Sequence, residues 1–439
     1  MLEHPASPHA TGSTNTMGAT NTTGAINHAA LSGRTVLFVI TEDWFFHSHF
    51  MPMAKAAIEA GYRVGVAARF DQHRNAIEAL GADTFELSLN RGRFNPLGAL
   101  TLIFKLRSLY NRLEPDLVHH ISLKPVVLGG IAARLATIPV TVNAVTGLGY
   151  VFTSQNPRLK TIRAVLTQVL KFAMGGRSSF ALLENQDDRQ VIMALGITQA
   201  DRITIVDGAG VDGQAFPAMP LPSQSPALDQ QQPAEQGQPS KRSGPLKIAL
   251  VARMLWSKGI DVAVDAVAKA RAQGAEVSLS LVGAPDPLNP QAVTEEKLRH
   301  YDQQDGVTWL GRRDDIQAVW QHHDIAMLPS RGGEGLPRSL IEAAACGRPI
   351  ITTDVPGCRE IVIDGTSGLI IPAHDSDALA TAIINLAQKS PDDLAAMAQA
   401  SRAHFETRFT ETAVTDRVIA LYGQAFTWAL ENDRLKRHP

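Results

Sequence analysis

The sequence predicts an α/β protein built from two doubly wound parallel sheets, each in its own domain. Short apolar runs without a clean polar alternation are followed repeatedly by helical stretches. Strands of this composition are buried on both faces, and the intervening helices cover those faces through right-handed crossovers. The alternation stops in one Pro- and Gln-rich segment and then restarts, which indicates two sheets rather than one.

The first half of the chain begins with a tail and then alternates regularly. Residues 1–33 contain no Lys or Arg and no apolar stretch, so neither a secretory signal nor a transit peptide fits, and we expect a disordered tail. A domain of residues 34–216 follows. Its expected strands are 36–40, 63–67, 84–88, 116–121, 139–145, 179–183 and 203–206, and its expected helices are 48–60, 72–80, 96–113, 125–136, 158–174 and 186–195.

The second half repeats this pattern after an interruption. Residues 217–245 hold seven Pro and six Gln with almost no large apolar side chain, which predicts a linker or an inserted loop. A second domain, 246–408, and a helical tail, 409–439, follow. The expected strands are 246–251, 276–282, 307–310, 324–328, 349–352 and 368–371, and the expected helices are 259–272, 291–303, 314–321, 336–346, 375–388, 391–404 and 411–432.

Composition excludes several classes of function. With 41 Lys and Arg against 43 Asp and Glu, the formal net charge of -2 argues against a nucleic-acid-binding protein that relies on bulk charge. Two cysteines, Cys346 and Cys358, are too few for a disulfide framework or a four-thiolate zinc site and favour a reducing compartment. No apolar run has the length of a membrane-spanning helix, so we expect any membrane contact to be peripheral.

Ligands of doubly wound sheets bind beyond the carboxyl ends of the strands, and the second domain carries suitable groups there. Arg253 and Lys258 bracket a strand-to-helix turn, where two cations and the N–H groups of a helix start favour a diphosphate. A solvated basic pair is the alternative interpretation. Gly283, after the next strand, would let a ligand approach the backbone closely, although an ordinary turn glycine explains it equally well.

The glycine-rich loop Ser330–Pro337 adds backbone amides and acids to this edge. Gly335 and Leu336 would aim their amides into the cleft, and Glu334 and Glu342 offer carboxylates that suit sugar hydroxyls. Alternatively, Glu334 is a first-turn helix acid and Glu342 a surface residue. The apolar sequence around Glu342 instead predicts a buried acid that needs partners, which favours function.

The first domain offers candidate ligand-binding residues at its own carboxyl edge. His119 and His120 end the strand 116–121, and the two-residue period of a strand puts them on opposite faces, so at most one can reach the cleft. We take His120 as that candidate, with a structural role for both as an equal alternative. Lys124 follows at the same sheet edge and suits a diphosphate.

Two further loops share this edge on the expected topology. Arg91 and Arg93 follow the third strand and are candidate diphosphate ligands, with solvated loop charges as the alternative. Gly147 and Gly149 follow the fifth strand and predict a loop that passes close to a ligand.

Residues 157–177 have the composition of an interfacial helix attracted to anionic lipid, although a core helix with a solvated basic face is the alternative. An apolar stripe at helical spacing is interspersed with cations and with no acid. The cations are Arg158, Lys160, Arg163, Lys171 and Arg177.

From Arg34 onwards the chain resembles the retaining glycosyltransferases of family 4, which have the GT-B fold of two Rossmann-like domains. Arg253, Lys258–Gly259 and the Glu334/Glu342 pair match the donor-site motifs of that family. The first domain resembles a bacterial subgroup that builds capsule, O-antigen and other lipid-linked glycans. The matching segments are Asp43–Phe46, Asp116–His120, Lys124–Pro125 and Val145–Phe152, whereas Ile121 stands where many members have His.

The resemblance implies transfer of a sugar from a nucleoside diphosphate, UDP by family habit, to a lipid-linked glycan with retained configuration, at the inner face of the plasma membrane. Arg253 and Lys258 would hold the diphosphate, Glu342 the ribose and Glu334 the donor sugar. The candidates of the first domain would then lie on the acceptor side, where Lys124, Arg91 and Arg93 suit the diphosphate of a lipid-linked acceptor. No metal is expected, because the cations and a helix dipole can neutralise the leaving diphosphate. A nucleotide-sugar 2-epimerase, or a catalytically silent nucleotide-sugar-binding subunit suggested by Ile121, stays open.

Overall fold

The computed structural model of the chain describes residues 32–87, 96–148, 152, 159–222, 244–287, 289–332 and 335–435. The first domain contains the strands β1 (Thr35–Glu42), β2 (Arg63–Arg69), β3 (Asp83–Glu86), β4 (Leu117–Ile121), β5 (Val140–Val145), β6 (Ser179–Leu183) and β7 (Ile203–Ile205). Its helices are α2 (Asp43–His49), α3 (Met51–Glu59), α4 (Arg74–Ala79), α5 (Pro96–Leu113), α6 (Leu123–Leu135), α8 (Leu159–Met174) and α9 (Gln186–Ala194).

The second domain contains the strands β8 (Leu246–Val251), β9 (Val277–Val282), β10 (Val307–Gly311), β11 (Ile325–Leu328), β12 (Ile350–Thr353) and β13 (Gly368–Ile371). The helices of the second half are α10 (Ile260–Ala272), α11 (Glu295–Asp302), α12 (Ile316–Gln321), α13 (Arg338–Ala345), α14 (Ser376–Gln388), α15 (Pro391–Arg408) and α16 (Glu411–Glu431).

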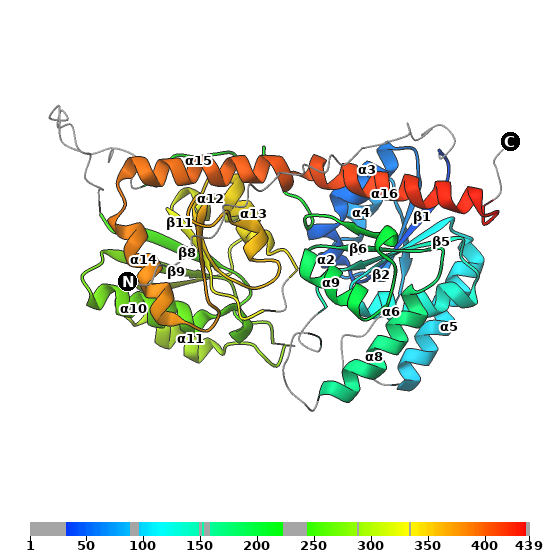
Figure 1. The fold of residues 1–439 in the computed structure, drawn as a ribbon, viewed down its shortest axis with the longest axis horizontal. Helices are drawn as coiled ribbons and strands as arrows, with labels where there is room; N and C mark the ends of the chain where they lie inside the picture. Colours follow the sequence, from blue (N-terminus) through cyan, green and yellow to red (C-terminus); the bar gives the residue numbers. More distant parts are fainter. Residues whose placement is uncertain are drawn as a thin grey trace, which may run out of the picture.

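The predicted fold class is confirmed. The first sheet has seven strands in the order β3-β2-β1-β4-β5-β6-β7, and the second has six in the order β10-β9-β8-β11-β12-β13 (Figure 1). Every pair of neighbouring strands is parallel. The strand order reverses between β1 and β4 and between β8 and β11, which places the ligand crevice of each sheet at the carboxyl ends of those strands.

Two expected helices begin or break elsewhere for local reasons. The helix expected over 48–60 is divided into α2 and α3 at Phe50, because Pro52 can stand only in the first turn of the following helix. The helix expected over 291–303 begins at Glu295. There the hydroxyl of Thr294 accepts a hydrogen bond from the Lys297 N–H at 3.2 Å and so caps the helix.

The C-terminal helix α16 belongs to the first domain, although the chain reaches it from the second. Figure 1 shows α15 (orange) along the second domain and α16 (red) continuing along the first. Val418, Leu421 and Phe426 of α16 lie in the same hydrophobic core as β1 and β4. The Tyr422 hydroxyl lies 2.6 Å from the Nδ1 atom of His119 inside that core. The predicted helical tail is therefore an integral layer of the first domain.

The chain passes between the domains twice, after β7 and again between α15 and α16, and these two crossing segments contact each other. Asp207 is buried after β7, and its carboxylate accepts hydrogen bonds from Arg408 at 2.5 Å and from Arg417. Val211 forms a parallel bridge with Thr410 beside this cluster. Because the two crossing segments are bonded to each other, the chain passes between the domains both times at the same place.

Part of the expected linker packs on the second domain. Leu221 is buried in the core of that domain, and the guanidinium of Arg348, itself fully buried, donates hydrogen bonds to the carbonyls of Met219 and Pro220. Residues 217–221 are thus anchored, and 223–243 lie outside the described residues.

Removing the Phe426 ring should destabilise the first domain. We expect Phe426→Ala to lower its free energy of unfolding by about 3–5 kcal/mol, because truncating a buried aromatic leaves a cavity in the core. Gln424→Ala, an exposed position on the same helix, is the matched control. Denaturant unfolding that gives equal stability for the two variants would show that α16 does not support this core.

Candidate active site

The site lies where the carboxyl edges of the two sheets face each other. Three contacts join the loops and helix starts that follow those edges: Leu336 to Glu184, Arg338 to Ser48 and Arg359 to Asp187. The first residue of each pair belongs to the second domain and the other to the first. The two crevices that the strand order defines therefore open towards each other.

Arg253 and Lys258 follow β8 in two consecutive tight turns. The Arg253 side chain is half exposed, and its Nη1 atom lies 2.9 Å from a carboxylate oxygen of Asp286. Lys258 ends the 3₁₀ turn Trp256–Lys258, directly before the start of α10. Both predicted cations thus stand at the switch edge of the second sheet, beside a helix N-terminus that favours anions.

Gly259 allows this turn to approach the end of β11. Its φ is +71°, and a Cβ atom added there would lie 2.0 Å from the Pro329 carbonyl oxygen. Residue 283 must be glycine for a comparable structural reason, since a Cβ atom there would lie 1.8 Å from the Ala252 carbonyl oxygen. Trp309 also donates its indole N–H to the Gly283 carbonyl at 2.9 Å. A donor contact at Gly283 stays a prediction.

Glu342 is buried on α13, as its apolar surroundings predict, and its partner is Arg338. Burial raises the pKa of Glu342, and the Arg338 charge opposes that rise. The Arg338 Nε atom donates to Glu342 Oε1 at 2.8 Å, while Nη1 donates to the Ser48 carbonyl of the first domain at 2.5 Å. Arg338 was not predicted, although its spacing of four residues before Glu342 on a helix is a usable signal.

Leu336 and Gly335 meet a second residue that the sequence did not single out. The Leu336 N–H donates to Glu184 Oε2 at 2.8 Å across the domain boundary. Burial raises the pKa of Glu184 to about 7, and the Leu336 hydrogen bond opposes that shift. Glu184 directly follows β6, and this position at a carboxyl edge is the signal that could have identified it. Glu334 lies outside the described residues.

The prediction that His120 lines the acceptor side is wrong. The ring is fully buried on a face of the sheet, where Nε2 lies 3.0 Å from the Tyr110 hydroxyl and Nδ1 lies 2.9 Å from Asn143 Oδ1. Burial lowers the pKa of His120 to about 4 and that of His119 to about 3. Both histidines are neutral core residues, because β4 is covered on both faces.

The other acceptor-side predictions fall at the expected edge or outside the described residues. Lys124 lies in the first turn of α6, half buried, and burial lowers its pKa while Glu42 opposes the shift. Gly147 follows β5 with φ +106°. Arg91, Arg93 and Gly149 are not among the described residues.

Two further residues of the first domain mark this edge. Ser122, directly after β4, has φ +71° and ψ +161°, a conformation that costs about 1–3 kcal/mol outside glycine and clusters at functional sites. His49, at the end of α2, is largely buried, and burial together with the charges of Arg338 and Arg253 lowers its pKa to about 4. A neutral imidazole of the first domain thus faces the cations of the second.

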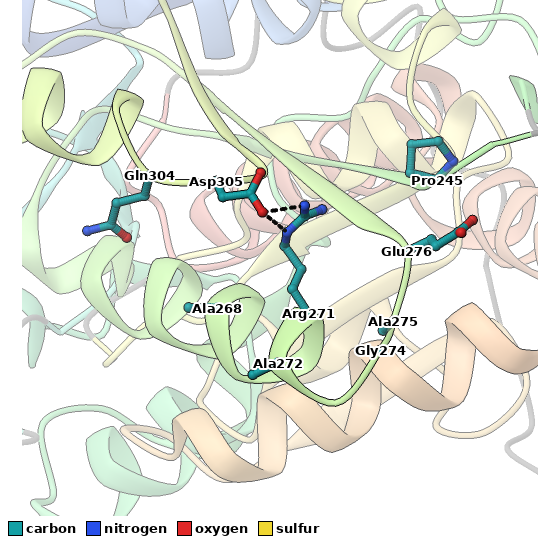
Figure 2. A pocket seen from close by; sticks show the side chains of 9 residues that line it. All are labelled: Pro245, Ala268, Arg271, Ala272, Gly274, Ala275, Glu276, Gln304 and Asp305. Carbon is teal, nitrogen blue, oxygen red and sulfur yellow. Dashed lines mark hydrogen bonds and ion pairs between the residues drawn. The ribbon is translucent and has the colours of Figure 1, made fainter.

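A cavity of about 910 Å³ lies elsewhere in the second domain. Figure 2 shows its lining residues, among them Arg271 bonded to Asp305. Pro245, Glu276 and Asp305 each stand just before a strand, so the cavity opens at the amino edge of the sheet. It is therefore on the side opposite the paired cations and is not the candidate site.

The arrangement defines a class of protein. The carboxyl edges of two doubly wound domains face each other, and they carry paired cations, a helix N-terminus and a buried carboxylate, which together suit a ligand with a diphosphate and hydroxyl groups. No group of three His, Cys, Asp or Glu side chains that could hold a metal ion occurs among the described residues. Within the same residues, no helix is both long enough and apolar enough to cross a membrane.

Comparison with known proteins identifies the family. Residues 245–389 match the family model described as glycosyl transferases group 1, and residues 35–175 match the model described as glycosyl transferase 4-like. The chain belongs to these glycosyltransferases and is related to enzymes that act on lipid-linked glycans.

Two curated relatives illustrate that relationship. The N,N'-diacetylbacillosaminyl-diphospho-undecaprenol alpha-1,3-N-acetylgalactosaminyltransferase of Campylobacter jejuni is 26% identical over 375 residues, 85% of this chain and 94% of the relative. The UDP-Gal:alpha-D-GlcNAc-diphosphoundecaprenol alpha-1,3-galactosyltransferase of Escherichia coli is also 26% identical, over 64% of this chain and 69% of that enzyme.

A solved structure supports the same fold. Anabaena HepE in complex with UDP and glucose superposes with a TM-score of 0.65, covering 88% of this chain and 98% of that one at 18% identity.

Glu184, the acid directly after β6, should make the free energy of unfolding depend on pH. The folded pKa of Glu184 is about 7 against an ordinary 4.5, so the folded protein binds this proton more tightly than the unfolded chain. Its contribution to stability is therefore present below pH 4.5 and is lost as the pH rises towards 7.

We expect Glu184→Gln to flatten this decline in the free energy of unfolding between pH 5 and 7, because Gln does not titrate. Denaturant unfolding at several pH values measures how the free energy of unfolding changes with pH in each variant. Glu276→Gln, an exposed position whose own charge faces solvent, should leave the slope unchanged. A wild-type slope in the Glu184 variant would show that this carboxyl titrates normally.

Proposed function

We propose that the protein transfers a hexose from a UDP-sugar to a lipid-linked glycan acceptor, with retention of configuration, in cell-surface polysaccharide synthesis. The observation that carries this proposal is the placement of Arg253 and Lys258 at the switch edge of the second sheet, with the Leu336 amide and Glu342 at the same edge. The two cations match a diphosphate, the Leu336 amide matches a phosphate or sugar oxygen, and Glu342 matches a ribose.

The comparisons support the choice of donor and stereochemistry. One relative is named for its UDP-galactose donor and its alpha-1,3 product, and a neighbour in fold was solved with UDP and glucose. An alpha product formed from an alpha-linked nucleoside diphosphate keeps the configuration of the anomeric carbon. We extend both properties to this chain.

The proposed reaction needs no enzymic nucleophile. The acceptor hydroxyl attacks the anomeric carbon from the face that the diphosphate leaves, the carbon–oxygen bond to the diphosphate breaks, and the electron pair departs with the phosphate. The hydroxyl proton passes to an oxygen of the leaving phosphate. Arg253 and Lys258 stabilise the charge that develops there, and no metal is required for that role.

The acceptor side of this proposal rests on the exposed faces of α8 and α5. On α8, Ile162 lies between Lys160 and Arg163 and is 53% exposed, Val165 follows Arg163 and is 60% exposed, and the helix carries no acid. Helix α5 has no acid either and exposes three apolar side chains near its start. These are Leu97, Leu100 and Phe104.

Exposed apolar groups interleaved with cations suit the interface of an anionic bilayer. We therefore propose that the first domain makes peripheral contact with the inner face of the plasma membrane, where it meets its acceptor. Arg158, at the start of the predicted interfacial segment, lies outside the described residues.

Arg253→Ala and Lys258→Ala should each reduce turnover by orders of magnitude without unfolding the protein. Losing one cation that stabilises a developing oxyanion costs about 3–4 kcal/mol of transition-state stabilisation. Sugar transfer with purified enzyme measures the effect, and Arg299→Ala, whose side chain is 71% exposed on α11, is the control. Wild-type rates for both variants would refute the diphosphate assignment.

The protein should sediment with vesicles that contain phosphatidylglycerol, and salt should release it. Each cation near an anionic surface contributes about 1 kcal/mol, and this attraction is screened by salt. Lys160→Glu with Arg163→Glu should lower vesicle binding.

The matched control for that experiment is Lys297→Glu with Arg299→Glu on α11 of the other domain, which should sediment like wild type. If the α8 variant binds vesicles as well as the α11 variant, the membrane contact does not involve α8.

A further inference from the structure

The Glu184 carboxylate accepts a hydrogen bond from the Leu336 backbone amide, which the proposed function assigns to the donor. Glu184 stands at the carboxyl end of β6 in the first domain, and its Oε2 atom accepts the Leu336 N–H at 2.8 Å. Leu336 stands next to Pro337, the N-cap of α13 in the second domain, and so lies beside a helix start whose N–H groups lack helical partners and favour an anion. A side chain of this chain thus sits where a phosphate or sugar oxygen of the donor would bind.

The absence of a side chain at residue 335 makes room for this carboxylate. A Cβ atom added to Gly335 would lie 2.0 Å from Glu184 Oε2 and 3.1 Å from the Thr146 carbonyl oxygen. Gly335 does not belong to the glycines with positive φ, so its backbone conformation alone does not require glycine. The close approach of an oxygen atom does require it, and a bound ligand would use the same space.

Glu184 holds this position with little electrostatic support. Among the described residues it forms no ion pair, and its acidic neighbour Asp188, four residues further on, adds repulsion. Burial disfavours its charged form, as its raised pKa reflects. A carboxylate that is bonded to an amide and not to a cation is weakly held. A ligand that also binds Arg253 and Lys258 can therefore displace it from the Leu336 amide.

We propose that Glu184 is an internal competitor of the donor: in the donor-free protein it binds the Leu336 amide and links the two domains, and donor binding displaces it. The proposal rests on the proposed function, since it assumes that a phosphate oxygen of the donor takes this amide. The affinity for the donor is then reduced by the fraction of molecules in which the carboxylate occupies the site. If the carboxylate occupies the site in most molecules, the apparent affinity for the donor is lowered by about three- to tenfold.

Titration calorimetry with UDP as the probe tests this competition. Glu184→Ala should bind UDP about three- to tenfold more tightly than wild type, because the competitor is gone. Glu184→Gln should fall between the two, since its amide oxygen still accepts a hydrogen bond without the charge. Gln190→Ala, an exposed position on α9, is the matched control and should bind like wild type.

A second measurement reads the contact directly and does not depend on UDP. Hydrogen exchange of the peptide that contains Leu336 should be faster in Glu184→Ala than in wild type, because the amide loses its acceptor. Melting temperatures of all variants establish that they fold, and Glu184→Gln serves if the alanine variant does not.

The outcomes separate this proposal from the proposed function. If wild type binds UDP and Arg253→Ala does not, but Glu184→Ala binds UDP equally or less tightly than wild type, the competition is refuted and the donor site stands. Weaker binding would make Glu184 a donor ligand instead. If wild type does not bind UDP, the proposed function itself fails.

Discussion

A parallel sheet that is covered on both faces can present functional side chains only where its strands end, and this constraint determines the chemistry of the whole chain. In both domains the central strands are buried by helices, so polar groups on their faces are core residues with internal partners, as His119 and His120 are. The cations, the glycine turns and the acids that remain available gather at the carboxyl edges. The loops from those edges touch each other through Leu336, Arg338 and Arg359.

The connection between the domains supports this edge-to-edge arrangement. The chain crosses twice, and the buried Asp207 binds arginines of the returning segment. Helix α16 then buries Val418, Leu421 and Phe426 in the first domain. Such an arrangement fixes the crossing, while the contacts of Leu336, Arg338 and Arg359 across the domain boundary are polar. Polar interdomain contacts of this kind permit relative motion of domains around a ligand.

The sequence was sufficient for the features that depend on local pattern. Apolar runs and helical periodicity identified the strands of both sheets, and the motif spacing placed Arg253, Lys258 and Glu342 at one edge. The positions it missed depend on contacts between distant residues. The face that His120 presents depends on how α6 covers β4, Glu184 is paired with a residue 152 positions away, and α16 packs on strands that begin the chain. Periodicity does not encode such partners.

We infer that a nucleoside diphosphate binds between the two domains at Arg253 and Lys258. A crystal structure of the protein with UDP would test this binding mode. We expect the diphosphate at the start of α10 within hydrogen-bonding distance of both cations, the ribose near Glu342, and the Glu184 carboxylate no longer bonded to the Leu336 amide. A diphosphate bound away from both cations, with that bond intact, would contradict it.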